Sequence, residues 1–159
     1  MTGTQWAQRS ALLAAAVLSA VVVGLFWDAS ARADAERGGT DALIAAREAI
    51  VAIGGYQPET VDHDLSAARQ RLTGAFLEAY NQAIQTVVIP NAKQQRLSSQ
   101  TSVPALGIVR ASADDVVLLA YVDQRFSSPA APPVDNQSRY RVAMTKVDGR
   151  WLMAGFDQI

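Results

Sequence analysis

The stretch SRYRVAMTKVDGRWLMAGFDQ, residues 138–158, indicates the fold class most directly. Apolar and polar residues alternate on both sides of Asp148-Gly149, and a period of two is typical of β-strands. Both residues tolerate positive φ, so this pair between two strand-like runs predicts a two-residue β-hairpin. We therefore expect antiparallel strands over 138–147 and 150–158. The alternation predicts an apolar face formed by Tyr140, Val142, Met144, Trp151, Met153 and Gly155.

Two further strand-like segments precede this hairpin, over 98–111 and 116–126. The segment SADD at 112–115 separates them. We expect 127–137 to be a long loop, because its prolines lack the N–H group that strand pairing uses. Those prolines are Pro129, Pro132 and Pro133. The sequence thus predicts an antiparallel sheet of about four strands over about 97–158.

Helical spacing precedes the sheet. Apolar residues recur every three to four positions from about residue 60 to about 95, with polar residues between them. Gly74 is expected to split this segment into a shorter and a longer helix. Pro90 is expected to interrupt it, because proline lacks the N–H group and clashes with the preceding turn.

A stalk and one further helix are expected ahead of that segment. Residues 28–40 are small and charged, and the Gly38-Gly39 break within them suits a short stalk. The folded domain is then expected over 41–159. Its first helix is predicted over 41–53 and should end at Gly54-Gly55, because glycine accepts the left-handed geometry of a helix C-terminus. Helices over about 41–95 followed by antiparallel strands indicate an α+β domain, with the helices packed on one sheet face.

An uncharged apolar run, SALLAAAVLSAVVVGLFW, lies at residues 10–27. A helix of about 20 residues crosses the hydrocarbon core of a bilayer, so this run predicts a single transmembrane helix. Trp6, Arg9 and Trp27 are its expected interface anchors. The short tail over 1–9 is then expected in the cytoplasm, and the chain from residue 28 onward outside it.

A cleaved signal peptide is the alternative for this run, since Ala29-Ser30-Ala31 has the small-x-small pattern of a cleavage site. Both interpretations send residues 28–159 across the membrane. If the span is retained, Ala16, Ala20 and Gly24 recur every four residues and form a candidate face for packing against another helix. Chance spacing in an Ala-rich span is the simpler explanation of that pattern.

Composition excludes several kinds of chemistry. Cysteine is absent, which rules out disulfides, thiol catalysis and Cys-ligated metals. His63 is the single histidine, and the sequence contains none of the common catalytic or nucleotide-binding motifs. The formal net charge is −1, so the chain has no excess of basic residues of the kind that a nucleic-acid-binding protein carries. We therefore expect a protein that is not an enzyme and that uses no cofactor, metal or nucleic acid.

Two groups of residues are candidates for binding. If the sheet curves, several aromatic side chains could line a pocket between the sheet and the long helix, although ordinary core packing is the simpler interpretation. Three strand arginines could dock an acidic partner or lipid headgroups, although a solvated sheet face is simpler. The pocket candidates are Phe76, Tyr80, Tyr121, Tyr140 and Trp151, and the docking candidates are Arg125, Arg139 and Arg141.

Three segments carry a resemblance to a known family: DLSAARQRLTGAFLEAYN at 64–81, AKQQR at 92–96 and NQSRYRVAMTKVDGRWLMAGFDQI at 136–159. In these segments, and in the order of tail, span, stalk, helices and sheet, the chain resembles the actinobacterial Mce-associated (mammalian cell entry associated) membrane proteins. The resemblance covers essentially the whole chain. It departs at Gly54-Gly55-Tyr56, where relatives often have a leucine- and tyrosine-rich helix end, and in the very short inner tail.

The resemblance implies a nuclear-transport-factor-2-like cone, in which helices pack into a curved antiparallel sheet. It also implies a non-enzymatic accessory subunit that assembles or stabilises an Mce-type lipid import complex. The expected location is the inner membrane, with protein subunits of the transporter, the membrane and a lipid as partners. The alternative is a membrane-anchored domain that binds a lipid or small ligand, or a cone-fold enzyme. That alternative requires a cavity open to solvent, and catalysis there requires a polarised acid or base.

Overall fold

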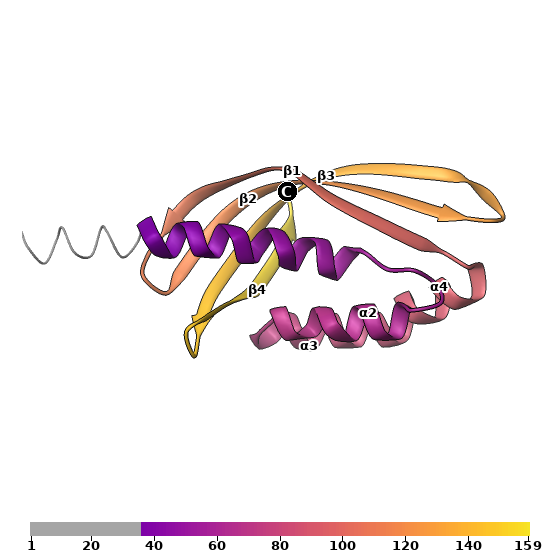
Figure 1. Cartoon of the computed structure of the whole chain (residues 1–159), viewed down its shortest axis with the longest axis horizontal. Helices are drawn as coiled ribbons and strands as arrows, with labels where there is room; N and C mark the ends of the chain where they lie inside the picture. Colours follow the sequence, from indigo (N-terminus) through magenta and orange to yellow (C-terminus); the bar gives the residue numbers. More distant parts are fainter. Residues whose placement is uncertain (1–35) are drawn as a thin grey trace, which may run out of the picture.

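The structure has an α+β architecture in which helices cover one face of an antiparallel sheet (Figure 1). The computed structural model describes residues 36–159. Its helices lie over 36–54, α2 (Val61–Ala68), α3 (Gly74–Ala83) and α4 (Ile89–Gln95), with a 3₁₀ turn η1 (Arg69–Arg71) and a π turn η2 (Ile84–Val88). Its strands are β1 (Ser98–Ala111), β2 (Asp115–Ser128), β3 (Ala131–Val147) and β4 (Arg150–Gln158), paired in the order β1-β2-β3-β4. The predicted α+β class and four-stranded antiparallel sheet are confirmed.

The predicted membrane anchor lies outside the described residues. This applies to Trp6, Arg9, Ala16, Ala20, Gly24 and Trp27. Among the helices within 36–159, none is long and apolar enough to cross a bilayer.

The hairpin at Asp148-Gly149 forms as the sequence predicts. Both residues have positive φ, 49° and 77°, and Val147 pairs with Arg150 across the turn. Positive φ at both central residues matches the right-handed twist of the flanking strands, which explains the Asp-Gly pair.

A bulge in β4 changes which residues share the inner face of this hairpin. Met144 pairs with Met153, but Ala143 already pairs with Gly155, so β4 carries one extra residue between them. Because alternation has a period of two, one extra residue moves everything beyond it to the opposite face. Phe156 therefore packs against the core, and the prediction that Gly155 lies on the inner face is wrong.

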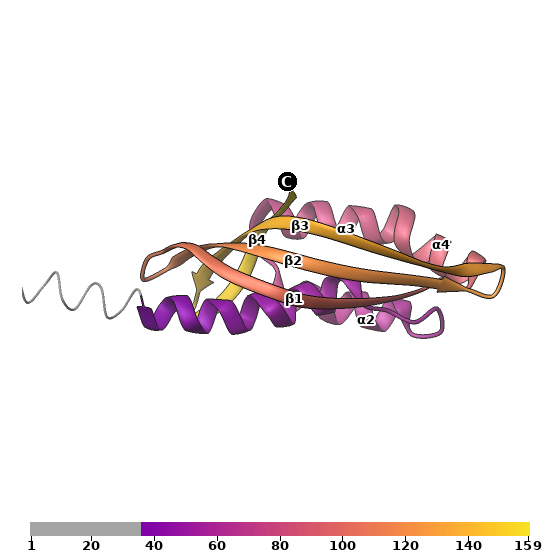
Figure 2. The ribbon, with the colours of Figure 1, turned by 90° about the horizontal axis from the view of Figure 1, so that it is seen from above.

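The core lies between the inner face of the sheet and the helices. Figure 2 shows the 36–54 helix running along β1, while α3 lies on the side of β3 and β4. Burying these apolar side chains provides most of the favourable free energy of folding, at roughly 25 cal/mol per Å². The largest fully buried side chains are Ile50, Leu65, Leu118, Met144, Met153, Val61, Val116 and Val142.

The glycine pair Gly38-Gly39 is helical and does not form the predicted break. Both residues are buried, and the helix passes very close to its neighbours at this point. A Cβ atom on Gly38 would lie 3.2 Å from Cζ2 of Trp151, and one on Gly39 would lie 3.0 Å from Cδ1 of Ile108. A side chain at either position would force these neighbours to shift by a few tenths of an ångström, so glycine favours the close approach for a tertiary rather than a local reason.

The segment 127–137 is not the predicted long loop. β2 and β3 continue through most of it, and Ser128 pairs with Ala131 at a tight turn. The prolines of β3 are tolerated because β4 pairs with β3 only from Tyr140 onward, so the earlier part of β3 is a sheet edge. The resulting β2–β3 hairpin projects beyond the rest of the sheet (Figure 1).

The predicted interruptions of the second helical segment are confirmed. Gly74 has φ of 59° and separates α2 and η1 from α3. The π turn η2 directly precedes α4, and Pro90 lies in the first turn of α4, so the regular α-helical hydrogen-bond pattern is interrupted just before this proline.

Substituting two glycines that have no close neighbours tests the backbone conformation of the hairpin turn without adding steric clashes. A Cβ atom would meet nothing within 4 Å at Gly149 or at Gly107, but only Gly149 has positive φ. We expect Gly149→Ala to lower the free energy of unfolding by about 1 kcal/mol, because L-residues are strained in this region. Gly107→Ala should be neutral or stabilising by about 0.5 kcal/mol. Chemical denaturation of both variants measures the difference, and equal effects would contradict the assigned turn geometry.

Candidate functional site

A pocket opens between the inner face of the sheet, α3 and the C-terminal end of the 36–54 helix. Its volume is about 360 Å³, near the lower end of the range for small-molecule sites. The 36–54 helix ends at Gly54, and α3 presents its small residues Ala79 and Ala83 to the space beyond it. The lining residues are Ile50, Ile53, Gly54, Phe76, Ala79, Tyr80, Ala83, Thr101, Val122, Gln124, Tyr140 and Phe156.

Aromatic rings form one wall of this pocket. Tyr140 and Phe156 stack with centroids 4.0 Å apart, and Phe76 lies 6.5 Å from both Phe156 and Tyr80. Three of the aromatic residues predicted from the sequence therefore meet here: Phe76, Tyr80 and Tyr140. Phe156 was missed, because strict alternation assigns it to the outer face and only the bulge in β4 turns it inward.

The other two predicted aromatic residues lie elsewhere. Tyr121 is on the outer face of the sheet, 45% exposed and opposite Arg139 in the β2–β3 pairing. Trp151 packs near Gly38, and Nζ of Lys146 lies 5.7 Å from its ring centroid. Neither residue lines the inner pocket, so they leave its volume open.

The polar groups of the inner pocket are few and uncharged. Nε2 of Gln124 lies 3.5 Å from Oγ1 of Thr101, at the upper limit for a hydrogen bond. The hydroxyl of Tyr80 is buried and has no hydrogen-bond partner. Burial raises the pKa of the Tyr80 phenol far above its usual value, while the charge of Arg69 lowers it by less, so this hydroxyl stays protonated at neutral pH. The lining contains no carboxylate, imidazole, amine or guanidinium group to act as an acid or base.

The outer face of the sheet has different chemistry. A depression of about 520 Å³ is lined by Pro104, Ala105, Tyr121, Asp123, Gln137, Ser138 and Arg139. Arg141 lies on the same face two residues along β3, where it pairs with Asp157 of β4 in the sheet register. Tyrosine and arginine side chains with apolar neighbours are the residue types that dominate protein–protein hot spots.

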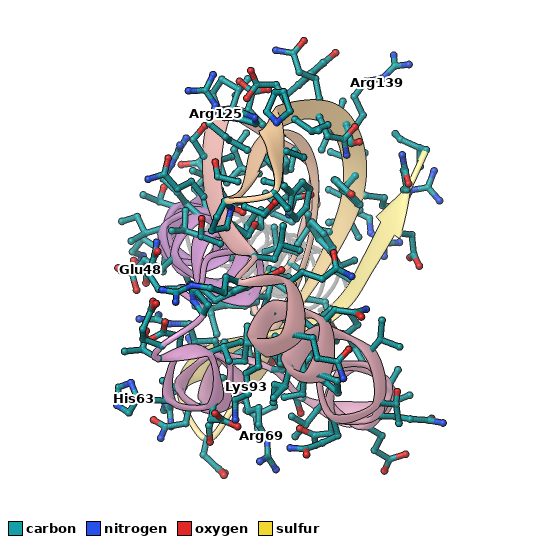
Figure 3. All side chains as sticks on the ribbon, turned by 90° about the vertical axis from the view of Figure 1, so that its right-hand side faces the viewer. Glu48, His63, Arg69, Lys93, Arg125 and Arg139 are labelled. Carbon is teal, nitrogen blue, oxygen red and sulfur yellow. The ribbon has the colours of Figure 1, made fainter. Side chains whose placement is uncertain are left out.

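Arg125 is already engaged by the projecting hairpin. Its Nε and Nη2 donate to the two carboxylate oxygens of Asp135 at 2.6 and 2.8 Å. This contact lowers the pKa of Asp135 and raises that of Arg125. Both side chains are exposed, so the pair adds little stability and serves mainly to link β2 to β3. Figure 3 shows Arg125 and Arg139 at the sheet end of the molecule, far from Arg69, His63 and Lys93 at the helical end.

The acidic residues on either side of His63 have structural contacts. Oδ2 of Asp64 accepts from the Thr60 hydroxyl at 2.6 Å, and this bond lowers the pKa of Asp64. Asp62 pairs with Lys93 at 2.6 Å, while His63 is highly exposed beside Asp64. Within residues 36–159 no cluster of three or more potential metal ligands is found.

The unpartnered hydroxyl of Tyr80 gives a stability prediction. Tyr80→Phe removes a buried hydroxyl that has no hydrogen bond, so it should be neutral or raise the free energy of unfolding by up to about 1 kcal/mol. Tyr121→Phe removes an exposed hydroxyl and should change stability by less than about 0.5 kcal/mol. Chemical denaturation compares both variants with the unmodified protein.

The pH dependence of the same variant provides its control. Above about pH 10 the unfolded phenol loses its proton while the buried phenol keeps it, so stability falls as the pH rises. Tyr80→Phe should lose less stability between pH 9 and 11 than the unmodified protein. Burial also raises the pKa of Tyr56, but Tyr56 contributes equally to both proteins. A clear loss of stability at neutral pH in Tyr80→Phe would show that the hydroxyl has a partner.

Comparisons with known proteins find mycobacterial relatives by sequence and several solved domains with a similar fold. No family model matches the chain. The chain is 39% identical to Outer membrane protein Rv1973 of Mycobacterium tuberculosis over 135 aligned residues. The aligned region covers 85% of this chain and 84% of Rv1973. It is also 36% identical to the uncharacterized protein Rv1362c of the same organism over 119 aligned residues. This aligned region covers 74% of this chain and 54% of Rv1362c.

Solved structures confirm the nuclear-transport-factor-2-like fold. A periplasmic fragment of TraM has a TM-score of 0.63 at 13% identity, covering 75% of this chain and 95% of the fragment. The VirB8 protein of Agrobacterium tumefaciens has a TM-score of 0.59 at 10% identity, covering 73% of this chain and 88% of VirB8. At such identities the likeness concerns the fold alone, whereas the identity to Rv1973 over most of both chains shows common descent. The chain therefore belongs to the family of the mycobacterial Outer membrane protein Rv1973.

Proposed function

We propose that this protein is a non-enzymatic, membrane-anchored accessory subunit whose folded domain lies outside the cytoplasm. In this role it assembles or stabilises an Mce-type lipid import complex. The observation that carries the proposal is the outer face of the sheet, where Tyr121 and Arg139 stand opposite each other beside a shallow depression.

The relatives support the membrane and the exterior as its location. The relative Rv1973 is named an outer membrane protein, and the TraM and DotI structures are periplasmic domains. Other solved neighbours, VirB8 and an IcmL-like protein, have the same fold, and the IcmL-like protein belongs to a type IV secretion system. These neighbours suggest that the domain of this chain serves in a multi-subunit membrane assembly.

The outer face has the chemistry expected of a protein-docking surface. Tyr121 provides a large amphipathic ring, while Arg139 and Arg141 provide donors on long side chains. Leu119 lies two residues before Tyr121 on β2 and so shares its face, and Gly107 of β1 pairs with Leu119, so both continue this face with small or apolar groups. No helix of residues 36–159 covers this side of the sheet (Figure 1). An acidic partner with an apolar ridge would complement it.

The inner pocket supports a role without catalysis. General acid–base chemistry requires a side chain with a pKa near the working pH. The only titratable groups in the lining are the phenols of Tyr80 and Tyr140, and burial moves the pKa of Tyr80 away from neutrality.

The finer identification, with Mce-type lipid import, rests on the family resemblance of residues 64–81, 92–96 and 136–159. The proposed anchor is the apolar run over 10–27, retained as a single span of the inner membrane. Its face of Ala16, Ala20 and Gly24 would pack against a helix of a partner subunit.

Charge reversal on the outer face tests the docking surface. We expect Arg139→Glu combined with Tyr121→Ala to reduce at least tenfold the recovery of partner subunits with the tagged full chain from gently solubilised native membranes. Truncating a hot-spot pair typically costs more than about 2 kcal/mol of binding free energy, which corresponds to about thirtyfold in affinity. Quantitative mass spectrometry of the retained proteins measures the loss.

The matched control reverses a charge on the helical side. Arg69 lies at the opposite end of the molecule from Arg139 (Figure 3), so Arg69→Glu should leave the recovered subunits unchanged. Equal losses from both variants, or recovery of the unmodified chain only as a free monomer, would contradict the proposed surface. Recovery of a complex without lipid-import subunits would contradict the Mce assignment alone.

Fractionation of the native envelope tests the anchor. We expect the full-length chain in inner-membrane fractions, extracted by detergent but not by high salt or alkaline carbonate, because an apolar span is held by the hydrophobic effect rather than by charge. Its C-terminal domain should be accessible to protease only from the outer side. Recovery in outer-membrane fractions, or release of a shortened soluble chain, would contradict the retained inner-membrane span.

A further inference from the structure

We infer that the inner pocket is a binding site for a neutral single-chain amphiphile, with its chain against the aromatic wall and its uncharged headgroup at Gln124 and Thr101. This inference concerns the inner face of the sheet and does not depend on docking at the outer face.

The shape of the pocket follows from two features of the chain. The 36–54 helix stops at Gly54, where a Cβ atom would lie 2.5 Å from Oγ1 of Thr101, so the helix end approaches the sheet closely without a side chain. Ala79 and Ala83, one turn apart on α3, are exposed and form the mouth. Larger side chains at these positions would fill the space, so small residues on two different elements keep it open.

The walls select an apolar body. Ile50, Ile53 and Val122 add aliphatic surface to the aromatic cluster of Phe76, Tyr140 and Phe156. Apolar walls of this kind gain roughly 25 cal/mol for each Å² of ligand surface that they remove from water. A purely polar ligand would gain nothing comparable here.

The polar groups select an uncharged headgroup. Gln124 and Thr101 offer an amide and a hydroxyl whose mutual contact is at the limit of hydrogen bonding, so both retain capacity to bond a ligand oxygen. No charged side chain lines the pocket. An ionised headgroup buried there would remain unpaired, which is far more costly than burying a hydroxyl with a hydrogen bond.

The volume sets the ligand size. About 360 Å³ corresponds to roughly twelve liquid-water volumes of about 30 Å³ each. A ligand of about a dozen non-hydrogen atoms would occupy this space, which makes 1-decanol a suitable probe. Decanoate and decylammonium have the same chain with a negative or positive headgroup, and 1-butanol has the same headgroup on a short chain.

The absence of native cysteine allows a single-site measurement on the full chain. We would introduce Ala83→Cys at the pocket mouth, reconstitute the full chain in phosphatidylcholine nanodiscs, and measure the rate of thiol modification by N-ethylmaleimide. We expect 1-decanol to slow this rate at least fivefold and saturably. Decanoate, decylammonium and 1-butanol should each require at least tenfold higher concentration for the same protection.

A second thiol position separates pocket binding from effects on the bilayer or reagent. Ala75 is also exposed on α3 but does not line the pocket, so the rate for Ala75→Cys should not respond to 1-decanol. Equal protection at both positions, or no protection of the Ala83→Cys thiol up to the solubility limit of decanol, would overturn the inference. Equal protection by decanoate would contradict the inferred preference for an uncharged headgroup.

Two further substitutions in the Ala83→Cys background, with one control, test the polar binding group and the pocket mouth. Gln124→Leu should raise the decanol concentration for half-protection at least fivefold, whereas Gln100→Leu, an exposed strand residue outside this pocket, should not. Ala79→Phe should fill the mouth and abolish saturable protection. Unchanged protection in both Gln124→Leu and Ala79→Phe would show that decanol binds elsewhere. Loss of partner recovery with intact decanol protection would affect only the proposed docking function.

Discussion

The close approach of the 36–54 helix to the inner face of the sheet is the constraint on which the rest of this structure depends. Gly38, Gly39 and Gly54 each lie where an added Cβ atom would meet the sheet or its turn at 2.5 to 3.2 Å. Between these contacts, Ala42, Ala46, Ala49 and Ile50 are completely or almost completely buried. A helix with small residues along its contact face can lie deep in a curved sheet, and this depth determines where the remaining space is left.

That space is the inner pocket, because the helix ends at Gly54 while β1, β2 and β3 continue beyond it. The helix packs against the inner face of the sheet up to Gly54, and beyond it the pocket is lined by α3 and by the aromatic residues of β3 and β4. The pocket is therefore a consequence of helix length relative to strand length. Gly54 has two effects here: it ends the helix, and it brings the helix end against Thr101.

Much of the fold could be predicted from the sequence where the signal is local. The strands over 98–111 and 150–158 have the bounds expected from alternation, and the Asp148-Gly149 turn has the predicted positive φ values. The errors have tertiary causes. Prolines exclude a segment from the middle of a sheet but not from an edge, and whether Pro132 lies at an edge depends on where β4 ends. The role of Gly38-Gly39 likewise depends on Trp151, more than a hundred residues later.

The candidate site shows the same division. Helical spacing and strand alternation place Phe76, Tyr80 and Tyr140 together. Tyr121, in contrast, alternates on β2 with the inward-facing residues and therefore lies on the outer face. Phe156 could not be assigned to the pocket from the sequence. A single extra residue in β4 moves the following side chains to the opposite face, and no local motif marks this bulge. Site prediction on a sheet therefore depends on register more than on residue type.

The two faces of one sheet separate the two proposed activities in space while connecting them through the strands. Tyr121 and Val122 are neighbours on β2, yet the first belongs to the outer depression and the second to the inner pocket. Arg139 and Tyr140 have the same relation on β3. Because alternate residues of a strand point to opposite faces, substitutions can change one surface without touching the other. The proposed docking at the outer face and the proposed ligand binding at the inner pocket are therefore separable by mutation, because neighbouring residues of one strand belong to different sites.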